Sequence, residues 1–183
     1  MRSPRSQRFF MLIPLLASVC ATLSGCGEGS DPLTVLGDPT QTPSLVLPIA
    51  SDKFLGISSP FDTRQANSLL DGIELSTTST AEVRAMAPGL VTAVETKADG
   101  VSITIMHSQR FVTRLSKLAS FTVRIGDSVV SAQKVGTTLT TPSLVHFTVL
   151  IDGTPVCPYG YLNTDAKQKL NLSTNVSFLP CQN

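Results

Sequence analysis

The sequence is poor in charge. Only 15% of its 183 residues are Asp, Glu, Lys or Arg, and the formal net charge is +1. Proteins that bind nucleic acids usually present a strongly basic surface, so this balance gives no indication of a nucleic-acid partner. The length is sufficient for one domain with its own hydrophobic core.

Long helical periodicity is also missing, and only residues 165–170 have the spacing of a short helix. From Pro48 onward, short apolar runs rich in β-branched residues alternate with turns that contain Gly, Asp or Ser. The pattern predicts strands near residues 53–58, 83–96, 101–107, 110–116, 121–124, 134–139 and 145–151.

Two of these runs, residues 91–95 and 101–105, alternate apolar and polar side chains. Each strand therefore has one apolar and one polar face, as expected in an antiparallel sheet that is covered on one side. Asp99-Gly100 between them is typical of a hairpin turn. The prediction is one all-β domain built on a single antiparallel sheet.

The first 25 residues are typical of an export signal. Arg2, Arg5 and Arg8 precede an apolar run over residues 9–23, which is too short to span a bilayer comfortably. The run leads into Leu-Ser-Gly-Cys at residues 23–26, which resembles a bacterial lipobox, where the cysteine, here Cys26, is lipidated and becomes the new N-terminus. An ordinary cleaved signal with a chance cysteine is the alternative. Loss of residues 1–25 removes three arginines and no acidic residue, which changes the formal charge from +1 to −2.

A lipid anchor at Cys26 implies a periplasmic or surface location, in an oxidising compartment. Gly27 follows in place of Asp, which favours the outer membrane by resemblance to enterobacterial sorting rules. Residues 26–47 contain many Gly and Pro residues and no apolar period. We therefore predict a flexible tether that lets the domain stand off the membrane.

Cysteine is scarce, since the chain has only four. Cys20 leaves with the signal and Cys26 carries the lipid, so Cys157 and Cys181 remain as a natural pair for a disulfide. The bond would close a loop of about 25 residues and stabilise the fold by about 3 kcal/mol in the chain-entropy model. Two free thiols and a two-cysteine metal site are the alternatives.

Several short motifs follow one another in order over residues 48–163. They are Ser-Ser-Pro-Phe-Asp-Thr-Arg at 58–64, Asp-Gly-Ile-Glu-Leu at 71–75, Ala-Met-Ala-Pro-Gly-Leu-Val at 85–91, Ile-Gly-Asp-Ser-Val at 125–129, Gln-Lys-Val-Gly at 133–136, Leu-Val-His-Phe at 144–147 and Gly-Thr-Pro-Val-Cys-Pro at 153–158. In this order they resemble the motifs of lysostaphin-type (LytM) zinc metallopeptidases, whose segments include His-x-Gly-Ile-Asp and His-Leu-His-Phe. The resemblance implies the fold of that family, an antiparallel β domain of the duplicated-hybrid-motif type.

The resemblance assigns the family's metal-ligand positions to Leu70, Glu74 and His146. A three-ligand zinc site needs lone pairs that converge on the ion, and Leu70 offers none. Glu74 has a longer side chain than the family's Asp, and His146 is unchanged. The positions of two histidines that assist catalysis in the family hold Lys117 and Leu144, and a lysine ammonium repels a cation. We therefore expect no bound zinc and no catalysis, as in a pseudoenzyme.

Other polar residues have simpler interpretations. His107, the only other histidine, is expected to be structural or at the surface. Ser143 lies close to His146 in sequence, but no nucleophile-elbow sequence surrounds it. Glu74 could form a remnant hydrogen bond with His146.

Two cations of the predicted sheet, Arg114 and Lys117, are interpreted as solvated side chains. The alternative is that they line the groove and meet an acidic segment of a partner.

Degenerate members of the resembled family activate cell-wall amidases, because their metal-free groove captures a regulatory helix of the amidase. Leu70 and Leu144 in place of imidazoles would turn a polar zinc cradle into an apolar patch suited to an amphipathic helix. The resemblance therefore implies a non-catalytic periplasmic lipoprotein that regulates a peptidoglycan hydrolase, an amidase in the first instance. The alternatives are a peptidoglycan-binding module without cleavage and an active zinc metalloendopeptidase on peptidoglycan.

Residues 164–183 extend beyond the resembled domain. We predict a helical turn within the stretch and an extra strand from Asn175 to Phe178. A disulfide between Cys157 and Cys181 would attach this extension to the closing turn of the domain.

Overall fold

The computed structural model describes residues 42–65, 68–172 and 181. The elements in chain order are η1 (Ser51–Lys53), β1 (Phe54–Ser59), β2 (Arg64–Gln65), β3 (Ser68–Leu69), β4 (Ile73–Thr77), β5 (Glu82–Arg84), β6 (Gly89–Lys97), β7 (Gly100–Met106), β8 (Phe111–Phe121), β9 (Ser128–Val129), β10 (Lys134–Thr138), β11 (Leu144–Ile151), β12 (Thr154–Val156), η2 (Pro158–Tyr161) and α2 (Thr164–Leu172).

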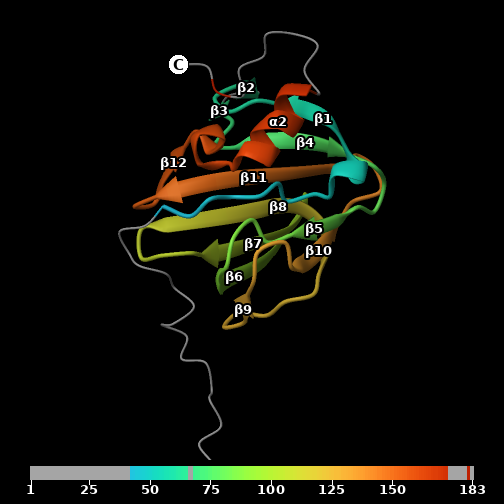
Figure 1. Cartoon of the computed structure of the whole chain (residues 1–183). Coiled ribbons are helices and arrows are strands. Elements are labelled where there is room, and N and C mark those ends of the chain that lie inside the picture. The colour runs from blue at the N-terminus through green and yellow to red at the C-terminus, as the bar shows by residue number, and fades with distance from the viewer. Residues whose placement is uncertain (1–41, 66–67, 173–180, 182–183) are drawn as a thin grey trace, which may run out of the picture.

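Ten of these strands form one sheet, in which every named pairing is antiparallel. The order is β1-β4-β11-β8-β7-β6-β9, with β12 on β11 and with β10 joining β8 to β5 (Figure 1). β2 and β3 pair separately as a two-stranded antiparallel sheet. The predicted all-β fold built on one main antiparallel sheet is confirmed. The hairpin at Asp99-Gly100 is confirmed as well, since β6 and β7 pair from Lys97 opposite Gly100 onward.

The predicted strands differ from the observed strands in several places. The stretch 83–96 is two strands, β5 and β6, because Pro88 has no N–H to donate to a ladder and lies in the break between them. The strand predicted at 110–116 is β8 and runs on to Phe121, while residues 122–124, predicted to be part of another strand, form a loop after it. Residues 73–77, where no strand was predicted, form β4 in the interior of the sheet.

The apolar face of the sheet forms the core. Along β11, Val145, Phe147 and Val149 are fully buried on one face, and α2 adds Ala166 and Leu170 to the same cluster. In Figure 1 this helix crosses in front of β4 and β11, and it confirms the helix predicted at 165–170. The opposite face of β11 carries the polar residues of the site.

The folded part begins earlier than the predicted domain start at Pro48. Leu45 is fully buried, and Leu47 is also part of the core. The Leu45 amide donates to the Tyr161 carbonyl over 2.9 Å, and the Asn163 amide donates to the Leu45 carbonyl over 2.8 Å. The last residues assigned to the tether therefore pack against the segment that leads into α2.

Several sequence predictions fall outside the described residues. They are the signal segment 1–25, the lipidation at Cys26, the tether up to residue 41 and the extra strand at Asn175 to Phe178. In the part of the chain that is described, no helix has both the length and the apolar character needed to cross a membrane.

His107 joins the turn before β6 to β8. Its side chain is buried, with Nδ1 2.7 Å from the Pro88 carbonyl oxygen and Nε2 2.8 Å from the Thr113 hydroxyl. Because a carbonyl only accepts, Nδ1 carries the proton, and neutral Nε2 accepts a hydrogen bond from Thr113. Burial lowers the pKa of His107, so the neutral ring is the folded form. His107 therefore has the expected structural role, since its ring connects the Pro88 carbonyl to the Thr113 hydroxyl.

The folded pKa of His107 lies below the value of about 6.5 in the unfolded chain, so the unfolded chain binds more protons between these two values. The contribution of His107 to stability is therefore complete above about pH 6.5 and is lost as the pH falls toward the folded pKa. Urea denaturation at neutral and mildly acidic pH should show a smaller acid loss of the free energy of unfolding for His107→Gln than for the wild type. Equal losses in the two proteins would contradict this account.

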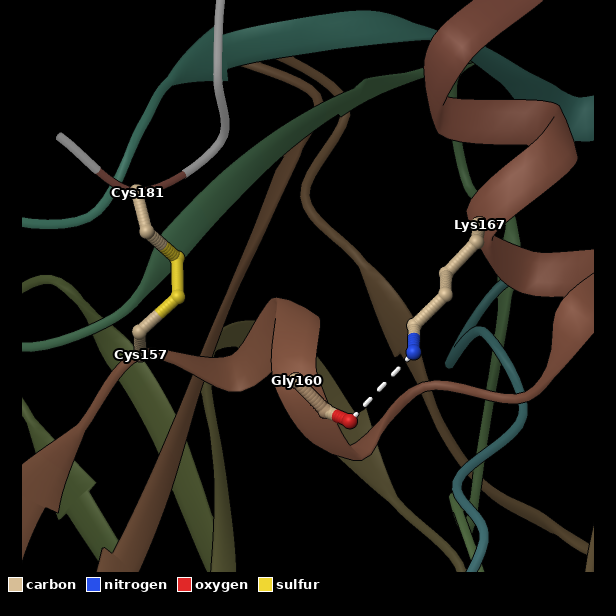
Figure 2. The surroundings of a disulfide bond; sticks show 4 residues. All are labelled: Cys157, Gly160, Lys167 and Cys181. Atoms are coloured by element: carbon tan, nitrogen blue, oxygen red, sulfur yellow. Dashed lines mark hydrogen bonds between the residues drawn. A yellow bond between two sulfur atoms is a disulfide. The ribbon is translucent and has the colours of Figure 1, made fainter.

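The C-terminal extension is tied down by a disulfide between Cys157 and Cys181, whose Cα atoms lie 5.8 Å apart. Figure 2 shows it beside η2, where the Lys167 ammonium donates to the Gly160 carbonyl over 3.3 Å. Cys181 also forms an isolated parallel bridge with Phe61, which precedes the loop into β4. The predicted pairing of these two cysteines is present in the structure.

Removal of this bond should destabilise the domain by about 3 kcal/mol, because the unfolded chain regains the freedom of the closed loop. The measurement is thermal unfolding of the wild type with and without reductant. The double variant Cys157→Ser/Cys181→Ser is the control, since it should melt like the reduced wild type and ignore reductant. An unchanged melting temperature of the wild type in reductant would contradict a stabilising bond.

Candidate functional site

The site positions named from the sequence meet on the polar face of three neighbouring strands. In the registers of the sheet, His146 in β11 lies opposite Glu74 in β4 on one side and opposite Ser116 in β8 on the other. Leu144 lies two residues before His146, on the same face. Leu70 is buried just before β4, with 8% of its surface exposed. The structure therefore brings Glu74, Leu144 and His146 to one face of neighbouring strands.

Glu74 is almost fully buried, and a lysine is one of its partners. Its side chain is 4% exposed, and the Lys117 ammonium donates a hydrogen bond to Glu74 Oε1 within an ion pair. Lys117 itself is 26% exposed. Burial of a carboxylate costs several kcal/mol, roughly, of hydration free energy, and the Lys117 ammonium offsets part of this cost for Glu74.

A β-bulge in β8 directs Lys117 toward Glu74. Val101 pairs with Leu118 and Ile103 with Leu115, so β8 contains one more residue than β7 over this stretch. Lys117 has a φ of 64°, a left-handed value that is uncommon outside glycine. Leu115 and Leu118 are both fully buried in the core. The residues between them, Lys117 included, are thereby left on the polar face.

Gly100 in β7 makes room for this bulge. Its φ is 124°, which glycine adopts readily and other residues do not. A Cβ atom at this position would lie 2.7 Å from the Leu118 carbonyl oxygen. Any larger residue would therefore push β8 away at the bulge that contains Lys117.

A second ion pair, between Asp71 and Arg114, adjoins the first. Arg114 Nη2 donates to Asp71 Oδ2, while the His146 Nε2 atom lies 3.2 Å from Asp71 Oδ1. The Thr148 hydroxyl donates to the same carboxylate oxygen over 3.4 Å. Asp71 and Thr148 were missed from the sequence, although period-two spacing from His146 and Ser116 places Thr148 and Arg114 on this face.

His146 is neutral in this setting at neutral pH. Burial lowers its pKa, and the nearby ammonium and guanidinium groups of Lys117 and Arg114 act in the same direction. The carboxylates of Asp71 and Glu74 oppose the shift without overcoming it. The ring is therefore an uncharged hydrogen-bonding group between two ion pairs.

Gly72 explains why a glycine stands in the motif Asp-Gly-Ile-Glu-Leu. A Cβ atom here would collide with the Phe147 carbonyl oxygen and with the His146 ring at Nε2. The loop before β4 can pass against His146 only because residue 72 has no side chain.

The structure corrects two expectations about this face. Arg114 and Lys117 are not simply solvated sheet residues, because each is only partly exposed and is paired with a carboxylate of the same chain. The apolar patch expected from Leu70 and Leu144 is also absent, since Leu70 is buried beneath the surface. The cleft above His146, about 160 Å³, has a largely polar lining that includes Lys97, Asp99, Ser102, Arg114, Ser116 and Lys117.

The suspected remnant bond between Glu74 and His146 takes a different form. The two residues are direct neighbours across β4 and β11. Glu74, however, accepts the hydrogen bond of Lys117, and the close carboxylate of His146 is that of Asp71.

Ser143 is engaged in a hydroxyl cluster away from any base. Its Oγ donates to the Thr78 carbonyl over 2.7 Å and lies 2.9 Å from the Thr77 hydroxyl and 3.2 Å from that of Thr138. These bonds give Ser143 a structural role at the start of β11.

The residues at the three ligand positions do not fit a zinc ion. Leu70 has no donor atom, and the Glu74 carboxylate is already neutralised by the Lys117 ammonium, which leaves His146. Across residues 42–65, 68–172 and 181, no cluster of three or more His, Cys, Asp or Glu side chains is arranged to hold a metal.

A larger cavity, of about 430 Å³, lies between the segment before β1 and α2. Its lining includes Leu47, Ile49, Arg84, Asp165 and Lys169, none of which lines the cleft above His146. Volume alone therefore does not locate the site, which is defined by the ion pairs around His146.

Comparison with known proteins identifies the domain. The model described as peptidase family M23 matches residues 68–158. A zinc-containing peptidase from Vibrio cholerae has a TM-score of 0.57 at 24% identity, over 63% of this chain and 39% of that one. Csd3 from Helicobacter pylori has a TM-score of 0.59 at 24% identity, over 67% of this chain and 34% of that one. A chain of the SpoIIQ–SpoIIIAH pore-forming complex has a TM-score of 0.56 at 20% identity, over 67% of this chain and 93% of that one.

These identities are below 25%, so the likeness establishes the fold. The chain spans only 39% and 34% of the lengths of the first two structures. Comparison with curated protein sequences gives no match.

Breaking the Lys117–Glu74 pair should cost more stability than breaking an exposed pair. Lys117→Met removes the Lys117 ammonium from the buried Glu74 carboxylate, and we expect a loss of about 3 kcal/mol in the free energy of unfolding. Arg110→Met is the matched control, because the Arg110 and Asp152 side chains are 66% and 54% exposed and their pair should contribute little.

Chemical denaturation of both variants measures the difference. The double variant Glu74→Leu/Lys117→Met should recover much of the loss, since no charge then remains buried. A loss for Lys117→Met no larger than for Arg110→Met would refute a buried, energetically coupled pair.

Proposed function

For a chain that contains a peptidase family M23 domain, we propose a non-catalytic role in the bacterial cell envelope. The protein binds a peptidoglycan hydrolase, an amidase in the first instance, and regulates its activity. The cleft above His146 is the contact site. The observation that carries this proposal is the Lys117–Glu74 ion pair, which places an ammonium group beside a carboxylate at a metal-ligand position of the resembled peptidases.

The chemistry of the site supports a role without catalysis. Hydrolysis of an amide by such peptidases needs a metal that polarises the carbonyl and lowers the pKa of bound water. Leu70 contributes no ligand, and Lys117 and Leu144 replace the assisting imidazoles. His146 is neutral, but the other two ligand positions hold Leu70 and a Glu74 carboxylate paired with Lys117. These positions therefore do not form a zinc site, and the described residues around His146 show no nucleophile paired with a base.

The envelope location rests on the N-terminal sequence. The export signal and the cysteine at position 26 support a lipid-anchored protein on the periplasmic side of the outer membrane. Peptidoglycan hydrolases act in the same compartment. The solved SpoIIQ–SpoIIIAH complex, one chain of which has this fold, is an example of such a domain in an assembly with a protein.

A second candidate is a peptidoglycan-binding module that does not cleave. It is favoured by the polar lining of the cleft, where Lys97, Arg114 and Lys117 offer hydrogen-bond donors to a wall peptide. An active zinc metalloendopeptidase is the least supported function, because the ligand positions do not fit the metal.

Regulation predicts a gain of amidase activity without activity of the protein itself. The purified full chain, mixed with each envelope amidase of the organism, should increase dye release from labelled sacculi for at least one of them. Alone, it should release none. If no amidase is stimulated, the proposal fails; if the protein sediments with sacculi at the same time, the binding-module function replaces it.

Metal analysis provides a separate test of the site. The purified chain should contain no stoichiometric zinc after dialysis, and its stimulating activity should survive a chelator that does not inhibit the amidase used. Stoichiometric zinc that His146→Ala abolishes would restore the metallopeptidase hypothesis.

A further inference from the structure

The cleft above His146 presents mainly cations to the solvent. Its lining includes Lys97, Arg114 and Lys117 but only one carboxylate, that of Asp99, at the turn between β6 and β7. The carboxylates that neutralise Arg114 and Lys117 belong to Asp71 and Glu74, which do not line the cleft. Lys97 is likewise paired, with Glu95 over 3.1 Å, and Glu95 does not line the cleft either. The lining itself therefore carries three cations and one carboxylate, although each cation has a carboxylate partner outside the lining.

These cations have donors to spare. A lysine ammonium carries three N–H donors and an arginine guanidinium five. Within the described residues, the Lys117 ammonium gives one hydrogen bond, to Glu74, and Arg114 gives one, to Asp71. Their side chains remain 26% and 31% exposed. The unused donors can therefore bind a second anion while the internal ion pairs stay in place.

The size of the cleft limits what can occupy it. Its volume of about 160 Å³ is well below the roughly 300–1,000 Å³ of typical small-molecule sites. It accepts one or two side chains of a longer segment that continues over the surface. The charged lining disfavours an apolar helix face, since burying Lys97 or Arg114 under apolar side chains would remove their hydration without replacing it.

We infer that this cleft binds carboxylate side chains of an acidic segment in the partner protein. Lys117 and Arg114 are the two cations that receive the carboxylate, and Lys97 at the rim attracts the segment. The inference rests on the proposed function, because it names the chemistry of the partner at the same site. Binding of this kind is charge-assisted and weakens as salt is raised.

The probe is a short fluorescein-labelled peptide that carries several glutamates, compared with a copy in which every glutamate is replaced by glutamine. Fluorescence anisotropy with the purified full chain in nonionic detergent measures both affinities at low and raised salt. The acidic peptide should bind at least about tenfold more tightly at low salt, and the difference should shrink with salt.

Variants at the rim of the cleft separate binding from folding. Asp99→Lys removes the one carboxylate of the lining and should increase the affinity for the acidic peptide severalfold, which a damaged fold cannot do. Lys97→Glu should lower it about tenfold, because it reverses a charge whose side chain is 52% exposed. Arg110→Glu is the matched control, since Arg110 is also an exposed cation but does not line the cleft.

The inference is overturned if the two peptides bind equally, or if Asp99→Lys and Lys97→Glu change affinity no more than Arg110→Glu. It is also overturned if these variants change the binding of the protein to sacculi but not its affinity for the acidic peptide. The anions that the cleft recognises would then be those of the wall. The amidase assay run in parallel keeps the two ideas distinct. If the protein stimulates an amidase but binds the two peptides equally, only the inference fails. If it binds the acidic peptide selectively but stimulates no amidase, only the proposed function fails.

Discussion

One buried ion pair, between Glu74 and Lys117, is the interaction on which the site depends. A carboxylate that is 4% exposed is stable in its charged form only with a counter-charge and a hydrogen bond, and the lysine ammonium supplies both. To reach it, β8 must bulge, Lys117 must take a positive φ, and β7 must have a glycine at position 100. The local backbone of the central strands is therefore arranged around this single pair.

Sequence reasoning predicted the sheet better than the site. Alternation along β6 and β7 is a local signal, because each apolar position must face the core whatever the strand's neighbours are. The ion pairs are not local: Glu74 and Lys117, like Asp71 and Arg114, are 43 positions apart in the chain. Pairing them requires the strand order and the extra residue in β8, and no turn residue in the sequence marks that bulge. For this reason two cations were interpreted as solvated.

The same geometry connects the fold to the proposed function. In the resembled peptidases the ligand side chains point at a metal ion. Here the ammonium group of Lys117, from β8, lies beside the Glu74 carboxylate instead. The neutral ring of His146 lies between two ion pairs and has no reacting group to serve. What remains is a polar, cation-lined cleft, which suits the proposed recognition of another envelope component.

Zinc titration of designed variants tests most directly whether the Lys117 ammonium stands where a metal would bind. Leu70→His restores a donor at the first ligand position, and a second change, Lys117→Ser, removes the ammonium. Calorimetric titration should show tight zinc binding only for the double variant, because the ammonium of Lys117 repels the ion in the single variant. Zinc binding by Leu70→His alone, as tight as by the double variant, would show that Lys117 does not exclude the metal and would contradict the account.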